Sequence, residues 1–429
     1  MYETIIVAVD FGTQKITAVA AKKNMRGVLT VLSVETVSSS GSILRGRIYN
    51  QEEVVYKLNH LLSILRKKHE IEIEKIYVGI GGQSVHAIPF AITRHLEAGE
   101  SEVTQKLLDS MMEECLNAEP EGWAVVGAVS PEYKADGRLE SNPKGVECKT
   151  IEAKYQLLVG RPSLERNLLD VAKKAGVSVA GIIPSVEAVS EAVLTATEKD
   201  LGCTLIDFGA GTTSVAVCKN RLLQYYTTLP VGSEAITKDL ASDNMTLEEA
   251  EEFKKSQGTA LPADDDTKNR IIEARVDEIL TNVVVLMKRA GVDVSFAEGV
   301  VITGGGALLK NMAEAVQESL KCKVRIANPK DSLFIQEIVM NASPEYALVT
   351  GLLSLGKENC ATVIEKPEPV REEKDLFGNV SVQEEKPKEE KPKKTEEPKP
   401  NKGGLFGRLK AQVGKGIDGV SKGLFDDEN

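Results

Sequence analysis

The 429-residue sequence lacks the patterns that mark zinc-binding, disulfide-rich and membrane-spanning proteins. Its six cysteines are widely separated without a C-x-x-C pair, and its four histidines do not cluster, so we expect reduced thiols in a cytosolic compartment. No run reaches about 18 uncharged apolar residues, and the N-terminus has no basic region before an apolar one. We therefore expect neither a membrane-spanning helix nor a signal peptide.

Acidic residues outnumber basic ones, which is unusual for a nucleic-acid-binding protein. A formal net charge of −11 and a pI near 5.2 argue against this class, because phosphate binding requires a basic surface. Residues 366–402 carry ten basic and ten acidic side chains and six prolines but few apolar residues, which predicts a disordered linker. Residues 403–429 also carry equal numbers of basic and acidic side chains, so the excess negative charge belongs to residues 1–365.

Short apolar runs alternate with helical patterns in the remainder, which predicts an α/β protein. Strands are expected at 4–10, 16–21 and 28–37, and a helix at 51–69. The segments V-A-V-D-F-G-T-Q-K (7–15) and L-I-D-F-G-A-G-T-T-S (205–214) are similar and lie roughly 200 residues apart. This internal repeat predicts two similar α/β halves.

Residues 84–158 interrupt this pattern. They contain strand-like runs at 86–94, 123–130 and 149–158, and a helical pattern at 103–116. We expect a small α+β insertion here. Helices are then expected at 185–197, 268–290 and 345–355, and another from about 308.

Glycines follow an apolar strand at three places: Gly12, Gly209 with Gly211, and Gly304–Gly306. Glycine allows the backbone to approach a ligand closely, and consecutive turn amides can bind an anion. Nearby hydroxyls would add donors, Lys15 would offset phosphate charge, and Asp10 and Asp207 could hold Mg²⁺ through its water shell. Each of these turns alone is more often only a turn, but the duplication together with the third glycine cluster predicts a nucleotide cleft.

The order Asp10-Phe-Gly-Thr, Asp207-Phe-Gly-Ala-Gly-Thr-Thr and Thr303-Gly-Gly-Gly-Ala resembles the actin, heat-shock chaperone and sugar-kinase superfamily. This resemblance implies an actin-like ATPase fold with ATP and Mg²⁺ as cofactors and with 185–197 and 345–355 as its connecting helices. The implied phosphate-binding residues are Gly12, Thr13, Gln14, Lys15, Gly209, Ala210, Gly211, Thr212 and Thr213. The implied adenosine-binding residues are Glu234, Lys238, Gly304, Gly305, Gly306 and Ala307, although the family commonly has two glycines where Gly232-Ser233 stands.

More specifically, the chain resembles the FtsA family of bacterial cell-division proteins. The residues that carry this resemblance are VAVDFGTQKITAVAA near the start, GGQSVHAI (81–88), PVGSEAITKDLA (230–241) and RIIEARVDEIL (270–280). The family implies a protein at the division site that binds the acidic and apolar C-terminal peptide of FtsZ, other division proteins and copies of itself. Lys288 and Arg289 would be candidate contacts for FtsZ, although most such charges are simply solvated.

The pattern and the resemblance together predict the following organisation: 1–83, first part of domain I; 84–160, inserted subdomain; 161–200, return to domain I; 201–358, domain II with a further insertion at about 233–295; 359–402, charged linker; 403–429, membrane-targeting segment.

The last segment, GGLFGRLKAQVGKGIDGVSKGLF (403–425), has an amphipathic helical pattern and net charge +3. Its many glycines disfavour a helix in water, so we expect it to fold on the inner membrane and to attach reversibly to anionic lipids. The alternative is docking on a protein groove. The expected membrane-contacting residues are Leu405, Phe406, Leu409, Val413, Ile417, Val420, Leu424 and Phe425.

No residue can be assigned as a catalytic base from the sequence, although Gln83 and Glu187 are conceivable. We therefore expect a scaffold with at most slow ATP hydrolysis. A small-molecule kinase or a pilus-assembly homologue of the same superfamily is the alternative, and the membrane-targeting segment argues against both.

Overall fold

The computed structural model describes residues 4–39, 41–96, 102–242, 244–262, 266–289, 291, 299–335 and 343–364. The membrane-targeting segment and residues 365–402 of the predicted linker lie outside these residues. The first residues of the predicted linker, 359–364, are described and include a short strand, so a linker beginning at 359 is wrong in detail. Within the described part, no helix has both the length and the apolar character needed to cross a membrane.

The first half is built on a five-stranded sheet in the order β12–β7–β1–β2–β3. β1 (Thr4–Phe11), β2 (Lys15–Lys23) and β3 (Leu29–Ser38) form an antiparallel meander, and β7 (Lys75–Ile80) and β12 (Ser178–Pro184) run parallel to β1. The central residues of β1 and β2, 5–9 and 16–21, are buried and mostly apolar because both faces of these strands are covered there. Helices α1 (Gln51–His69) and α3 (Ser163–Lys174) pack against this half.

The second half repeats this topology. Its sheet has the order β15–β14–β13–β16–β17, with bounds Leu222–Leu229, Thr213–Lys219, Cys203–Phe208, Val300–Thr303 and Val324–Ile326. Asp10 pairs with Thr17 in the β1–β2 ladder, and Asp207 pairs with Ser214 in the corresponding β13–β14 ladder. The predicted duplication is therefore confirmed as two sheets of the same strand order, each with an aspartate near the end of its central strand.

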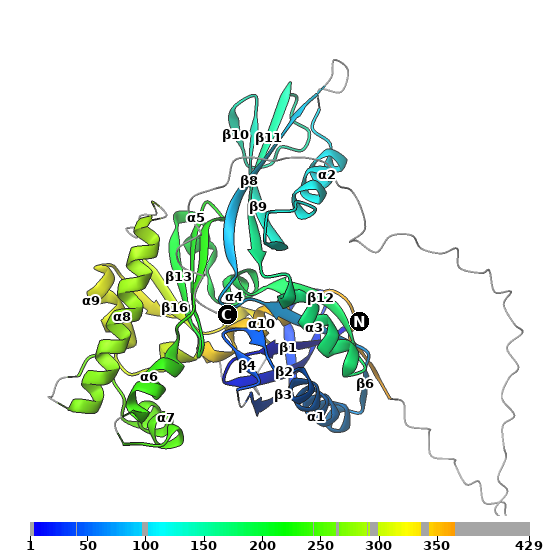
Figure 1. Ribbon diagram of the computed structural model, residues 1–429. Coiled ribbons are helices and arrows are strands. Elements are labelled where there is room, and N and C mark those ends of the chain that lie inside the picture. Colours follow the sequence, from blue (N-terminus) through cyan, green and yellow to red (C-terminus); the bar gives the residue numbers. More distant parts are fainter. Residues whose placement is uncertain are drawn as a thin grey trace, which may run out of the picture. The chain divides into compact units, whose positions relative to one another are not determined.

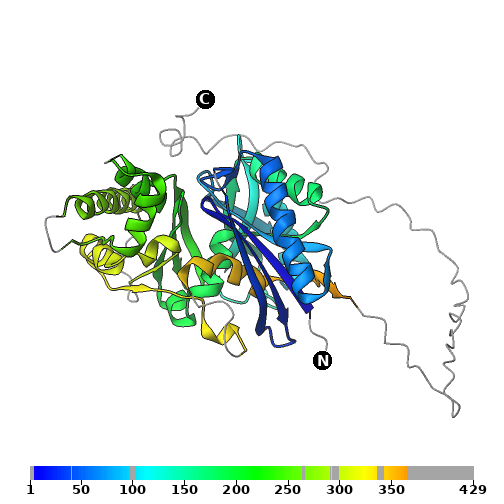
Figure 2. The same cartoon turned by 90° about the horizontal axis from the view of Figure 1, so that it is seen from below.

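Helices of the second half lie together on the side away from the first half (Figures 1 and 2). They are α6 (Ser233–Ala241), α7 (Leu247–Ser256), α8 (Thr267–Arg289) and α9 (Met312–Leu320). Arg275 of α8 holds Asp239 of α6 through two hydrogen bonds of 2.5 and 3.0 Å, which fixes these two helices against each other.

The inserted subdomain projects from the rest of the described chain (Figure 1). β8 (His86–His95), β9 (Ala124–Ala135), β10 (Arg138–Glu140) and β11 (Thr150–Gly160) form a sheet in the order β10–β9–β11–β8, covered by α2 (Gln105–Leu116). Its residues form a hydrophobic cluster of their own, which includes the fully buried Tyr155 and Leu157. This confirms the expected α+β insertion.

Two helices connect the halves beneath the cleft. α4 (Ser185–Val193) and α10 (Ala347–Leu355) pack closely, and they lie at the centre of Figure 1. A Cβ atom on Gly351 would lie only 1.8 Å from the carbonyl oxygen of Ala188. The contact therefore requires glycine in α10.

Two helix predictions are wrong in detail. The helix expected at 185–197 ends at Val193, because Leu194 is extended and a new helix α5 (Ala196–Leu201) begins with a capping box between Thr195 and Glu198. The helix expected from about 308 begins at Met312 instead, after a 3₁₀ turn at Gly305–Leu308 and a left-handed Asn311.

Several short elements had no clear sequence signal. They are β4 (Ile43–Leu44), β5 (Arg47–Ile48), β6 (Ile71–Ile73), β18 (Ala361–Val363) and the 3₁₀ turns Asp331–Leu333 and Pro344–Tyr346. β18 pairs with β6, so the end of the described chain returns to the first half.

We predict that Gly351→Ala destabilises the protein by about 2 kcal/mol or more, because the added methyl group must push α4 and α10 apart. The gain in helix propensity of about 1 kcal/mol is too small to offset this. Chemical denaturation measures the change. Ser354→Ala, at a half-buried position of the same helix, removes an atom instead of adding one; it is the control and should change the free energy of unfolding by no more than about 0.5 kcal/mol. Equal stability of the two variants would contradict this account of the helix contact.

Candidate functional site

A cavity of about 190 Å³ lies between the two halves, lined by the glycine turns that the sequence singled out. This is far more than the 10–15 Å³ that one buried water needs. Eight of the nine predicted phosphate-binding residues line it, as do Asp10 and Asp207. Of the six predicted adenosine-binding residues, Gly304 and Gly305 line it.

The first turn joins β1 to β2. A Cβ on Gly12 would lie 2.7 Å from the carbonyl oxygen of Lys15, so the tight turn requires glycine. The Ser39 hydroxyl donates to the Gly12 carbonyl at 2.6 Å and so holds the turn from outside.

The second turn joins β13 to β14 and has the same form. Gly209 N–H donates to the Thr212 carbonyl at 2.9 Å. The N-terminus of α6 holds the turn, because the N–H groups of Ser233 and Glu234 donate to the carbonyls of Gly209 and Ala210 at 3.0 and 2.9 Å. Thr213 does not face the cavity: it is fully buried, and its hydroxyl donates to the Val231 carbonyl at 2.9 Å.

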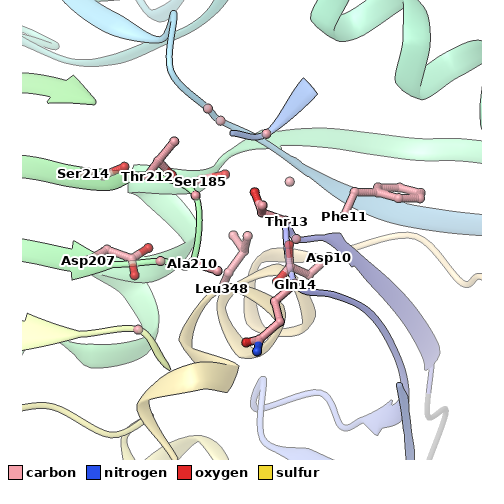
Figure 3. Close-up of a pocket in the computed structure, with 18 of the residues that line it drawn as sticks. Asp10, Phe11, Thr13, Gln14, Ser185, Asp207, Ala210, Thr212, Ser214 and Leu348 are labelled. Atoms are coloured by element: carbon pink, nitrogen blue, oxygen red, sulfur yellow. The ribbon is translucent and has the colours of Figure 1, made fainter. Parts of the chain in front are cut away.

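The two turns approach each other across the cavity. A Cβ on Gly211 would lie 2.5 Å from the Thr13 hydroxyl oxygen, so the second turn nearly touches the first. Figure 3 shows Asp207 and Ala210 on one side and Asp10, Thr13 and Gln14 on the other. A ligand between the turns would therefore meet backbone and hydroxyl donors from both halves.

The third glycine cluster packs against the second half. Gly304 has φ +83°, and a Cβ there would lie 2.3 Å from Asp207 Oδ1, so this position requires glycine. Ala307 is fully buried in the second core. Glu234 and Lys238 form an ion pair of 3.1 Å on α6, and neither is among the described residues that line the cavity.

Asp10 and Asp207 define the electrostatics of the cavity. Burial raises the pKa of Asp10 to about 7, with a further contribution from the charge of Asp207, and Lys15 opposes the rise. Burial also raises the pKa of Asp207 to about 6. In the partly enclosed cavity the charged form of each carboxylate is disfavoured. A divalent cation with its water shell would stabilise that charged form, so the two carboxylates suit such an ion.

The first turn is also tied to the second half by two side chains. Lys15 Nζ lies 2.5 Å from Glu345 Oε2, and Gln14 Nε2 donates to Glu251 Oε1 of α7 at 2.9 Å. Burial alone would raise the pKa of Glu251, but hydrogen bonds from Lys254, Thr237 and Gln14 lower it to about 2. Glu251 is therefore a charged acceptor at neutral pH.

Sequence reasoning missed part of the lining. Gly46, Gly79, Gly81 and Gly82, Ser185, and Pro344, Glu345, Ala347 and Leu348 also face the cavity, whereas Ser214, which lines it too, was among the hydroxyls expected to donate to phosphate. The rule that identified Gly12 would have found Gly81 and Gly82, since they directly follow β7. Among the described lining residues, neither Gln83 nor Glu187 is present.

The remaining candidates lie elsewhere. Lys288 and Arg289 are exposed in the last turn of α8. The eight candidate membrane-contacting residues fall outside the described part of the chain.

The raised pKa values predict how the stability of the ligand-free protein depends on pH. Both exceed the ordinary value of 3.8, so between about pH 4 and pH 7 the folded protein binds more protons than the unfolded chain. These two groups therefore lower the free energy of unfolding as pH rises through this window, and their effect is constant above it. Asp10 has the larger pKa rise, so Asp10→Asn should remove most of this pH dependence. Thermal unfolding should therefore show that the stability of the variant relative to wild type is greater at about pH 8 than at about pH 5. A pH-independent difference would show that Asp10 is not buried in this way.

Comparison with known proteins supports the assignment suggested by the sequence. The family model described as "Cell division protein FtsA" matches residues 204–351. An FtsA of Porphyromonas gingivalis is 28% identical over 340 residues, which cover 74% of this chain and 71% of the relative. An FtsA of Bacillus subtilis is 27% identical, with 83% of this chain and 84% of the relative covered.

A similar fold occurs in a solved structure of the "PilM-PilN type IV pilus biogenesis complex". The TM-score is 0.60 at 14% sequence identity, over 81% of this chain and 97% of that chain. At this identity the likeness concerns the fold alone, which is the actin-like ATPase fold. The family model and these relatives show that the chain is similar to FtsA cell division proteins over most of its length.

Proposed function

We propose that the chain is an ATP-binding cell-division protein that tethers FtsZ filaments to the cytoplasmic face of the inner membrane at the division site. The observation that carries the nucleotide part is that two duplicated glycine turns, each beside a half-buried aspartate, converge on one cavity. In this proposal Gly12–Lys15 and Gly209–Thr212 bind the phosphates from opposite sides. Gly304 and Gly305 support the nucleoside end, with Glu234 and Lys238 near it as the family resemblance implies.

The cavity suits a nucleotide that carries Mg²⁺. Asp10 and Asp207 would hold the hydrated ion, which would offset the phosphate charge between the two halves. The turns contribute backbone N–H groups and the hydroxyls of Thr13 and Thr212, which donate to phosphate oxygens without a net charge. Binding therefore draws the halves together around the ligand.

We expect ATP to act mainly as a conformational and assembly switch. The two polar residues considered as a possible catalytic base, Gln83 and Glu187, are not among the described residues that line the cavity. Turnover should therefore be slow or negligible, and the nucleotide should stabilise one arrangement of the halves. Self-association into a polymer and recruitment of other division proteins follow from the family resemblance.

The proposed tether has two ends. The basic Lys288 and Arg289 are exposed at the end of α8, where they could meet the acidic and apolar C-terminal peptide of FtsZ. At the other end, the amphipathic segment 403–425 with net charge +3 would insert its apolar residues among anionic lipids. The linker between them would let one end bind a filament while the other binds the membrane.

Gly305 provides a clean test of the nucleotide site. A Cβ there would meet only the Glu345 Cβ, at 3.9 Å, so Gly305→Val should project into the cavity without disturbing the fold. We predict that the variant keeps its thermal stability and binds ATP at least about tenfold more weakly, measured by fluorescence titration with Mg²⁺ present. Lys288→Ala, remote from the cavity, is the control and should bind as wild type. Unchanged ATP affinity of Gly305→Val would rule out this cavity as the nucleotide site.

The membrane part is tested by two substitutions that change charge equally. On a helical wheel Val413 lies within the apolar arc of the segment, whereas Ala411 lies opposite it. We predict that Val413→Glu reduces co-sedimentation of the full chain with anionic vesicles by about tenfold or more, because a carboxylate would enter the apolar layer. Ala411→Glu should have a much smaller effect. Similar losses for both would show that attachment depends on charge alone and not on an inserted helix face.

A further inference from the structure

The charged side chains around the cavity are unbalanced. Among the described lining residues, Asp10, Asp207 and Glu345 are acidic, and Lys15 is the cationic one. A site for a polyphosphate ordinarily carries excess positive charge, since like charges in a partly enclosed site repel strongly. This cavity instead has more acidic than basic side chains in its lining.

Glu345 is one of these acidic residues, and its backbone position is well defined. It belongs to the 3₁₀ turn Pro344–Tyr346, which is fixed to the third glycine cluster. The Pro344 carbonyl accepts hydrogen bonds from Gly304 N–H at 3.3 Å and from the Thr303 hydroxyl at 3.4 Å. The backbone that carries Glu345 is therefore held beside the third glycine cluster of the second half.

The partner of Glu345 comes from the other half. Lys15 Nζ lies 2.5 Å from Glu345 Oε2 and 4.7 Å from the centre of the Tyr346 ring. The side chains of Lys15 and Glu345 are 30% and 32% exposed, so the pair is only partly screened by solvent. The lysine predicted to neutralise phosphate thus already neutralises a carboxylate.

We propose that Glu345 makes the cavity select metal-complexed nucleotide over metal-free nucleotide, because its carboxylate competes with phosphate for Lys15. This proposal rests on the nucleotide-binding function proposed above. A metal-free polyphosphate brings four negative charges or nearly so, and Lys15 cannot neutralise both it and Glu345. A nucleotide with a bound divalent cation depends less on Lys15, so the Lys15–Glu345 pair can remain intact. Glu345 acts here through Lys15 and is a positioning residue.

The test compares ATP affinities of the full chain in Mg²⁺ and in EDTA, by equilibrium titration with a fluorescent ATP analogue. We expect Glu345→Gln to bind metal-free ATP about tenfold more tightly than wild type does, and Mg²⁺-ATP within about threefold of wild type. The metal selectivity, the ratio of the two dissociation constants, should therefore fall about tenfold. A role in packing alone would weaken both affinities together and leave the ratio unchanged.

Two further variants sharpen the comparison. Glu345→Asp keeps the charge and should keep most of the selectivity of wild type, which separates the charge from the shape of the side chain. Glu358→Gln breaks a different glutamate–lysine pair, at 2.8 Å from Lys75 and away from the cavity, and should have no effect on either affinity. Thermal unfolding of each variant shows whether it is folded, and Glu345→Ala, which also removes the carboxylate, carries the test should Glu345→Gln not fold.

The outcomes distinguish this inference from the function on which it depends. An unchanged selectivity ratio in Glu345→Gln, with wild type binding Mg²⁺-ATP, would overturn the role of Glu345 and leave the nucleotide site standing. A wild-type chain that binds ATP in neither condition would overturn the proposed nucleotide function, and this inference with it.

Discussion

The architecture depends on placing two half-buried carboxylates on opposite sides of one cavity. Asp10 and Asp207 end the central strands of two sheets that share one strand order, and burial raises the pKa of each. Around them the chain uses glycine wherever a side chain would collide: Gly12 and Gly209 in the turns, and Gly304 directly against Asp207. The cavity exists because these backbones can approach each other, and its charged lining is mainly acidic.

The elements that surround the cavity connect it to distant surfaces. The N-terminus of α6 holds the second turn, while Glu251 of α7 accepts a hydrogen bond from Gln14 of the first. α6 is in turn joined to α8 through Asp239 and Arg275. These contacts connect the cavity to α8, the helix that carries Lys288 and Arg289, which the proposed nucleotide-dependent tether requires.

The sequence was sufficient for the parts of this arrangement that are local. An apolar strand followed by aspartate and glycine identified both turns, because strand, turn and carboxylate are adjacent in the chain. Lys15 was expected to face phosphate, yet its partner Glu345 lies 330 residues away and could not be inferred from spacing. Likewise, Thr213 lies in β14, where successive side chains point to opposite faces of the sheet, and its hydroxyl donates to Val231 instead of facing the cavity. Matching the motif alone does not reveal this orientation. The break after Val193 was missed for a different reason, since the apolar pattern continues across it while a capping box begins a new helix.

The central claim is that the duplicated turns close on Mg²⁺-ATP, and a crystal structure of the chain with Mg²⁺ and a non-hydrolysable ATP analogue tests it most directly. We predict density for the phosphates between Gly12–Lys15 and Gly209–Thr212, with the hydrated ion beside Asp10 and Asp207. An analogue bound at another surface, with this cavity holding only water at saturating nucleotide, would contradict the account.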